Sequence, residues 1–256
     1  MRLVVKFPTR GRPRRFLHAL DRYVALRSGA HDVQFVISMD RDDRAMNNAG
    51  MSHLLHRLRR GSGNRIHFAY GASTSKVEAC NADLDLVRGL HPDVILLASD
   101  DMIPIAPGYD AIIARDMAAY FPDTDGVLHY HDGFLGQDTL ITQSILGRTY
   151  FERFGYLYHP EYTSVFCDNE FTDVARLLGK VAYFDRCIIQ HQWVGLPYIV
   201  ARGQAGGVEG VRDPLHERNQ SPRIYDRDRA VYERRRANNF GLLTDQADGS
   251  TAAATS

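Results

Sequence analysis

The sequence predicts an α/β fold built around a mostly parallel sheet, and two observations carry this prediction. Strand-like and helix-like segments alternate over residues 1–120, as they do in β–α–β units. Residues 94–98, VILLA, are apolar throughout, which is typical of a strand covered on both faces in the middle of a parallel sheet. With 256 residues, the chain is long enough for one large domain with a substantial core.

The first half of the chain supplies four strand–helix pairs. Strands are predicted at 3–7, 33–39, 66–70 and 94–98, and helices at 13–27, 51–60, 76–90 and 109–120. The helices are predicted because apolar residues recur at intervals of three and four, which places them on one face. Pro13 suits a first helical turn, and His91-Pro92 is expected to end the third helix.

The second half is less regular and predicts a mixed α/β arrangement. Strands are predicted at 126–130, 139–146, 181–184 and 187–190, and helices at 149–154, 168–178 and 226–238. Residues 200–223 contain Gly-Gln-Ala-Gly-Gly and two prolines, so this stretch is predicted to be a loop. Residues 244–256 are small and polar, which predicts a disordered tail.

Composition narrows the function classes. Hydrophobic residues make up 44% and charged residues 24% of the chain, which is ordinary globular usage. The 31 basic residues balance the 31 acidic ones, which argues against nucleic-acid binding by bulk charge but leaves room for a local basic patch. The three cysteines are far apart and match no zinc-site spacing. Since the chain also has no run of about 20 apolar residues, we expect a cytoplasmic protein without a transmembrane segment.

Polar residues follow the predicted strands, where ligands bind in open α/β sheets. They are Thr9-Arg10, Asp40, the 71–76 loop and Asp100-Asp101. Adjacent carboxylates such as Asp100 and Asp101 are hard oxygen ligands suited to Mg²⁺ or Mn²⁺. A turn carrying two solvated acids is the alternative interpretation.

Two further positions point to a phosphate-bearing ligand. Asp40 ends a strand, where it can accept hydrogen bonds from a base or a ribose. Lys76 opens a predicted helix, and a lysine at a helix N-terminus attracts phosphate. This segment is not a Walker loop. Lys76 and Asn81, five residues further on, are otherwise ordinary surface residues.

Several later residues are candidates for the chemistry itself. His191 follows a predicted strand and could complete a carboxylate metal site or be purely structural. Asp168 and Glu170 lie in a predicted first helical turn, where capping and the helix dipole account for one acid. The other acid is free to act as a general base. His131 and Asp132 are predicted to line a pocket, with an exposed strand end as the alternative.

The order of these motifs resembles that of the GT-A glycosyltransferases, especially family 2-like enzymes. The segments that carry the resemblance, over roughly residues 3–195, are Phe7-Pro-Thr-Arg-Gly-Arg-Pro13, Asp40, Ser75-Lys76 with Asn81, Leu96-Leu-Ala-Ser-Asp-Asp-Met102, Pro107-Gly-Tyr-Asp110, Asp168-Asn-Glu-Phe171 and His191-Gln-Trp193. The resemblance implies a single domain over 1–243. Its nucleotide-sugar-binding half would be Rossmann-like and span 1–120, and its acceptor-binding, catalytic half would span 121–243.

The resemblance also implies roles for individual residues. The donor-binding residues would be Pro8, Thr9, Arg10, Asp40, Lys76, Asn81 and Asp100. The family's DXD motif reads Ser-Asp-Asp here, so Asp101 is the implied metal ligand, together with His191. Counting back from Arg176 places Glu170 at the base position, with Asp168 as its rival. His131, Asp132 and Trp193 would line the sugar or acceptor pocket.

The resemblance implies transfer of a sugar from a nucleotide-diphosphate sugar to an acceptor hydroxyl, with inversion at the anomeric carbon and with Mn²⁺ or Mg²⁺ as the cofactor. UDP is the commonest carrier among such enzymes. The acceptor is expected to be a glycan or a hydroxymethylated DNA base of the phage type, and arginines clustered near both ends of the chain favour a polyanion. Two alternatives stay open: a metal-dependent nucleotidyltransferase, and a non-catalytic nucleotide- or glycan-binding protein.

Overall fold

The computed structural model describes residues 1–133, 139–192 and 214–242. Its strands are β1 (Arg2–Pro8), β2 (Asp32–Asp40), β3 (Ile66–Gly71), β4 (Val94–Leu97), β5 (Met102–Pro104), β6 (Val127–Tyr130), β7 (Ile145–Gly147), β8 (Val181–Phe184) and β9 (Ile189–His191). Its helices are α1 (Pro13–Ala25), α2 (Ala49–Gly61), α3 (Lys76–Asn81), α4 (Leu84–Gly89), α5 (Tyr109–Tyr120), α6 (Arg148–Phe154), α7 (Cys167–Leu177), α9 (Pro214–Asn219) and α10 (Pro222–Ala237), with a 3₁₀ turn at Asn239–Gly241.

Seven of the strands form one mixed sheet in the order β3-β2-β1-β4-β7-β6-β8. Strands β3, β2, β1 and β4 are parallel, β7 is antiparallel to both of its neighbours, and β6 and β8 are again parallel. The predicted α/β fold with a mostly parallel sheet is therefore confirmed. The register aligns Phe7 with Ile37 and Lys6 with Leu97, so the carboxyl ends of the parallel strands meet at one edge.

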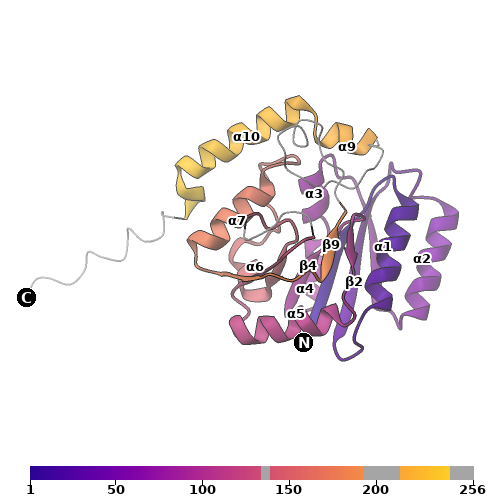
Figure 1. The fold of residues 1–256 in the computed structure, drawn as a ribbon. Coiled ribbons are helices and arrows are strands. Elements are labelled where there is room, and N and C mark those ends of the chain that lie inside the picture. Colours follow the sequence, from indigo (N-terminus) through magenta and orange to yellow (C-terminus); the bar gives the residue numbers. More distant parts are fainter. Residues whose placement is uncertain (134–138, 193–213, 243–256) are drawn as a thin grey trace, which may run out of the picture.

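Helices cover both faces of this sheet (Figure 1). On one face, α1, α2 and α5 pack on side chains such as Phe7, Phe35 and Leu96. On the other face, α3, α4, α6 and α7 pack on side chains such as Val36 and Ile95. Strand β4 contributes to both cores and is fully buried, as its uniformly apolar sequence predicts. No helix in the described part of the chain is both long and apolar enough to span a bilayer.

The helix predicted at 76–90 is wrong as a continuous element, because it divides into α3 and α4. Ala82 is extended, and Asp83 is left-handed with φ 58°, a conformation that aspartate tolerates better than most residues. Asp83 accepts a hydrogen bond from the hydroxyl of Ser38 on β2. The break therefore comes from a tertiary contact between residues 45 apart in sequence, which helical periodicity does not register.

Other elements also differ from the prediction. The strand predicted at 139–146 is observed only at its end, in β7. Earlier in this segment, the Ile141 N–H donates to Thr172 Oγ1 on α7 instead of to a neighbouring strand. The loop predicted at 200–223 is wrong over its last part, where α9 begins at Pro214 and α10 at Pro222; both prolines occupy first helical turns. The strand predicted at 187–190 is β9, which ends at His191 and pairs with β5. The predicted tail at 244–256 lies outside the described residues.

Candidate active site

The carboxyl edge of the sheet is tied together by Asp40, the last residue of β2. Its two carboxylate oxygens accept from the Arg10 guanidinium (Nη1–Oδ2, 2.9 Å) and from the backbone N–H of Ser73 (2.7 Å). Arg10 also makes two bonds of 2.7 Å to Asp42. Asp40 thus fixes the loops after β1 and β3, and it keeps spare lone pairs for a ligand, since a carboxylate accepts up to about four hydrogen bonds.

The residues that follow β1 face this same edge. Pro8 ends the strand, and the Thr9 N–H donates to Ser38 O at 3.0 Å. The Thr9 hydroxyl is buried and has no hydrogen-bond partner among the described residues. A buried polar group without a partner is costly unless a ligand or water satisfies it.

Asp100 and Asp101 follow β4 but occupy different surroundings. Asp100 is buried against Arg12 (Oδ1–Nη1, 3.1 Å), and burial raises the pKa of its carboxyl to about 6. Burial also raises the pKa of Asp101, but the neighbouring His191 and Ser99 outweigh it and hold that pKa below its usual value. Asp101 is therefore a carboxylate, the form that ligates a cation.

The short β5–β9 ladder brings His191 to Asp101. Met102 pairs with His191, and Gln192 N donates to Asp101 O at 2.7 Å. The ring Nε2 of His191 lies 3.8 Å from Asp101 Oδ2. Two residues 90 apart in sequence thus present a carboxylate and an imidazole side by side.

Asp132 lies behind the His191 ring. Its Oδ2 is 3.8 Å from His191 Nδ1, a buried atom without a hydrogen-bond partner within the described ranges. The Asp132 carbonyl accepts the His191 N–H at 2.8 Å, and Thr142 Oγ1 donates to Asp132 Oδ2 at 2.7 Å. Burial by itself would lower the pKa of the His191 imidazole. The carboxylates of Asp101 and Asp132 outweigh burial and raise this pKa above its usual value, to about 9.

The oxygen and nitrogen atoms of Asp101 and His191 are ligands that this edge offers to a divalent cation. The described residues contain no group of three or more His, Cys, Asp or Glu side chains arranged around a common point. Among the described residues, Asp101 and His191 are the two candidate donors that lie beside each other. This set fits a cation that takes its remaining ligands from substrate phosphates and water, as Mg²⁺ and related ions do in phosphoryl-transfer sites.

Lys76 and Asp168 lie on two other elements, and Lys76 interacts electrostatically with Asp168 and Asp101. Lys76 is the first residue of α3, and Asp168 lies in the first turn of α7, where its Oδ1 accepts the Asn169 N–H at 3.1 Å. Desolvation lowers the pKa of Lys76, but acidic neighbours that include Asp168 and Asp101 raise it above its usual value. Because α3 has only six residues, the attraction that Lys76 exerts on an anion comes from its own charge rather than from a helix dipole.

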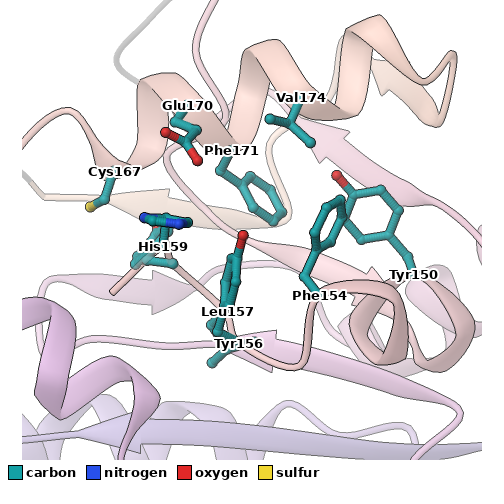
Figure 2. Close-up of a pocket in the computed structure, with 10 residues that line it drawn as sticks. Tyr150, Phe154, Tyr156, Leu157, His159, Cys167, Glu170, Phe171 and Val174 are labelled. Atoms are coloured by element: carbon teal, nitrogen blue, oxygen red, sulfur yellow. The ribbon is translucent and has the colours of Figure 1, made fainter. Parts of the chain in front are cut away.

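Glu170, two residues after Asp168, faces a different environment. Its oxygens accept from Arg235 on α10 at 2.7 and 2.9 Å and from Tyr162 Oη at 2.7 Å. Figure 2 shows Glu170 at the wall of a cavity formed with rings such as Phe154, Tyr156 and Phe171. The space open to the centre of a water molecule there is about 20 Å³, enough for a water but not for a sugar.

The remaining predicted residues are spread over the edge. The Asn81 side chain accepts from Leu157 N at 2.9 Å and donates to Tyr158 O at 2.6 Å, so it holds a loop. His131 is half-buried, and its Nδ1 accepts the Gly133 N–H at 2.9 Å. Trp193 lies outside the described residues. The structure thus brings together Asp101, His191 and Asp132, with Lys76 and Asp168 close enough to interact electrostatically, and sets Glu170 apart.

Sequence reasoning did not identify the partners of these groups: it considered the arginines of the 226–236 segment as contacts for a polyanion and gave Thr142 no role. Arg235 pairs with Glu170 across 65 positions, and Thr142 holds Asp132 across ten. An arginine in a charge-rich helix and a threonine in a loop carry no local pattern that marks them. Only the packing of α10 on α7 and of the 139–144 segment on β9 identifies them.

Comparisons of the whole chain with known proteins identify its fold. No protein-family model and no curated protein sequence match the chain. Among solved structures, a mannosyltransferase from Pyrobaculum calidifontis in complex with GDP-Man and Mn²⁺ aligns with a TM-score of 0.55 and 14% identity, covering 92% of this chain and 75% of that one. S. aureus TarS in complex with UDP aligns with a TM-score of 0.51 and 16% identity, covering 96% and 76%. The chain therefore has the GT-A fold of nucleotide-sugar glycosyltransferases.

Proposed function

We propose that this protein is a metal-dependent glycosyltransferase that moves a sugar from a nucleoside-diphosphate sugar to an acceptor hydroxyl. One observation carries the proposal: the β5–β9 ladder sets Asp101 beside His191 at the carboxyl edge of a GT-A sheet. The same edge presents Lys76 and Asp168 within electrostatic reach of one another. These are the groups needed to hold a diphosphate and to accept a proton.

The donor is held by residues of the 1–120 half. Asp40, with its remaining lone pairs, and the unpartnered Thr9 hydroxyl would meet the nucleoside, beside Pro8 and Arg10. The Lys76 ammonium would pair with the diphosphate. Mn²⁺ or Mg²⁺, held by Asp101 and His191, would offset the charge on the leaving diphosphate. Asp100, neutral over more of the pH range because of its raised pKa, would make a secondary contact to the nucleotide-sugar donor.

Asp168 is the base in this proposal. Its carboxylate would take the proton from the acceptor hydroxyl while the acceptor oxygen bonds to the anomeric carbon and the bond from that carbon to the diphosphate breaks. A single displacement of this kind inverts the anomeric centre. Glu170 is the less suitable base, because both of its oxygens are engaged by Arg235 and Tyr162.

The two halves of the chain divide the substrates. Residues 121–243 would form the acceptor side, where His131 and Trp193 are the candidate contacts. Asp132 is assigned instead to the support of His191, which it faces. A UDP-sugar is the first donor to test, with GDP-mannose second, because UDP and GDP-Man occupy the two structural neighbours described above. A glycan or a hydroxymethylated DNA base is the proposed acceptor.

The first experiment is calorimetric binding of UDP, GDP and TDP, each with and without Mn²⁺. It compares the unaltered protein with Asp101→Ala and with a control, Asp85→Ala, whose carboxylate is fully exposed on α4. We expect one diphosphate to bind in a Mn²⁺-dependent way to the unaltered and control proteins, and the Mn²⁺ dependence to vanish in Asp101→Ala. Absence of binding to every diphosphate would overturn the donor site.

A second experiment separates the bases and the reaction classes. Asp168→Asn should keep nucleotide binding and lose transfer, whereas Glu170→Gln should keep measurable transfer. Release of a nucleoside diphosphate from the donor supports sugar transfer. Release of pyrophosphate from a nucleoside triphosphate would support a nucleotidyltransferase instead, and binding without turnover a non-catalytic protein.

A further inference from the structure

The carboxylate of Asp228, on α10, is buried completely and receives three consecutive backbone N–H groups. Its Oδ2 accepts from Thr163 at 3.1 Å, Ser164 at 2.7 Å and Val165 at 3.0 Å. Its Oδ1 accepts from Thr163 N at 3.0 Å and from Arg227 Nη1 at 2.8 Å. Successive amides that converge on one anion form a nest. Here the anion is supplied by the chain itself, from a helix more than 60 residues away.

The tripeptide 163–165 joins two elements that carry the site, α3 and α7. Thr163 O accepts the N–H of Val77, the residue next to Lys76 on α3. Phe166 follows the tripeptide in a left-handed conformation, with φ 62°, and α7 begins at the next residue. Asp168 is the second residue of α7. The position of the nest therefore sets both the start of α3 and the first turn of α7.

Helix α10 lies along α7 at the upper edge of the molecule (Figure 1) and contacts it beyond the nest. Phe166 packs against Tyr225 and Tyr232, with ring centroids 5.1 and 5.6 Å apart. The Tyr232 hydroxyl donates to Asp173 at 2.6 Å. Together with the Glu170–Arg235 pair, these contacts hold the helix in place along its length, so loss of the nest contact alone leaves α10 attached.

We propose that Asp228 is a positioning residue for the transfer reaction: it fixes the 163–165 nest and thereby holds Asp168 and Lys76 at their working separation. The proposal rests on the function proposed above. Without the carboxylate, the three amide donors lose their acceptor in a buried place. The tripeptide then shifts to find other partners, and the first turns of α3 and α7 shift with it. A displacement of about 1 Å in a catalytic group costs up to about 100-fold in rate.

The test compares Asp228→Asn with a matched control, Asp226→Asn, on the same helix. The Asp226 carboxylate is 70% exposed and its nearest ion-pair partner is Arg229 at 3.8 Å. In Asp228→Asn the amide group faces Thr163 N–H and Arg227, which are donors too, so at least one contact is lost. Amide hydrogen exchange over 163–166, kcat, KM for the donor, and the Kd of the nucleoside diphosphate with Mn²⁺ are measured for each variant.

We expect Asp228→Asn to speed exchange at the 163–165 amides and to lower kcat about tenfold or more. The nucleotide Kd should rise by less than kcat falls, because Lys76 on α3 is the donor-binding residue that moves, whereas Asp40 ends β2 and Asp101 follows β4. The control should match the unaltered protein in every readout. Arg227→Ala, which leaves the carboxylate but removes its ion pair and the bond from Arg227 to the Thr163 hydroxyl, should show smaller changes in the same direction, and it decides the matter if Asp228→Asn does not fold.

Three results would overturn the proposal. Unchanged exchange at 163–165 would mean that Asp228 does not hold the nest. Faster exchange with unchanged kcat would mean that the nest does not position the catalytic groups. A fall in nucleotide affinity as large as the fall in kcat, together with a loss of thermal stability, would mean that the role of Asp228 is purely structural. If the unaltered protein releases no nucleoside diphosphate from any donor, the proposed function fails on its own, and the exchange data still report on the nest.

Discussion

The Glu170–Arg235 contact predicts that replacing Glu170 lowers the stability of the protein without abolishing sugar transfer. The two side chains are 5% and 16% exposed, and the pair is bidentate, at 2.7 and 2.9 Å. Replacing one partner of a buried pair leaves the other charge uncompensated, which typically costs about 3–5 kcal/mol. Glu170→Gln keeps the shape and one acceptor oxygen, so we expect the free energy of unfolding to fall by about 3 kcal/mol, the lower end of that range.

Urea denaturation followed by circular dichroism measures this loss. With a denaturant slope of about 3 kcal/mol/M for a chain of this size, the unfolding midpoint should fall by about 1 M. Glu152→Gln is the control, because its carboxylate is 62% exposed and 3.9 Å from Arg148; its unfolding free energy should change by less than about 0.5 kcal/mol. A midpoint within about 0.3 M of the unaltered protein, together with complete loss of transfer, would refute the reasoning and return Glu170 to the role of base.

Three other predictions concern groups around the site. Asp132→Ala should weaken Mn²⁺ binding about 10–100-fold by releasing His191 from its carboxylate support; calorimetry with Mn²⁺ and nucleotide checks this, and an unchanged metal affinity would contradict it. Asn81→Ala should lower the free energy of unfolding by about 1–3 kcal/mol, since the Tyr158 backbone loses its partner, with the nucleotide Kd unchanged. A raised nucleotide Kd at unaltered stability would instead mean that Asn81 contacts the nucleotide-sugar donor. Burial lowers the pKa of Lys6 to about 8, so the unfolded chain binds more protons than the folded one between pH 8 and about 10.5. The free energy of unfolding of the unaltered protein, measured relative to that of Lys6→Met, should therefore rise by about 3 kcal/mol across that window. A free-energy difference between the two proteins that does not change with pH would exclude the effect.

The sequence predicted the parts of the fold that local pattern controls. The alternation of strands and helices over the first 120 residues and the apolar run of β4 were enough to place the parallel strands and their carboxyl ends. The divided helix at α3 and α4 was missed because it depends on Asp83 meeting Ser38 from another strand. Strand β5 was missed because three residues, Met102–Pro104, form a strand only when β9 is beside them.

For the candidate site, the sequence predicted which residues to consider but not which of them contact one another. Asp101 and His191 were predicted from motif order, and the structure sets them side by side. Asp132 was predicted as an acceptor contact, whereas its carboxylate faces His191 Nδ1. Sequence spacing could not indicate this contact, because Asp132 and His191 are 59 positions apart.

The choice between Asp168 and Glu170 shows why helical position and packing must be combined. Both acids lie in the first turn of α7, where capping and the helix dipole favour either one. Two positions along a helix correspond to a rotation of about 200°, so the two carboxylates cannot face the same cleft. Glu170 faces α10 and finds Arg235 there, and Asp168 is left on the side of Lys76, whose charge it stabilises. In the proposed mechanism, helix α10 thus determines which acid remains available for chemistry: Arg235 engages Glu170, and Asp228 holds the turn that precedes Asp168.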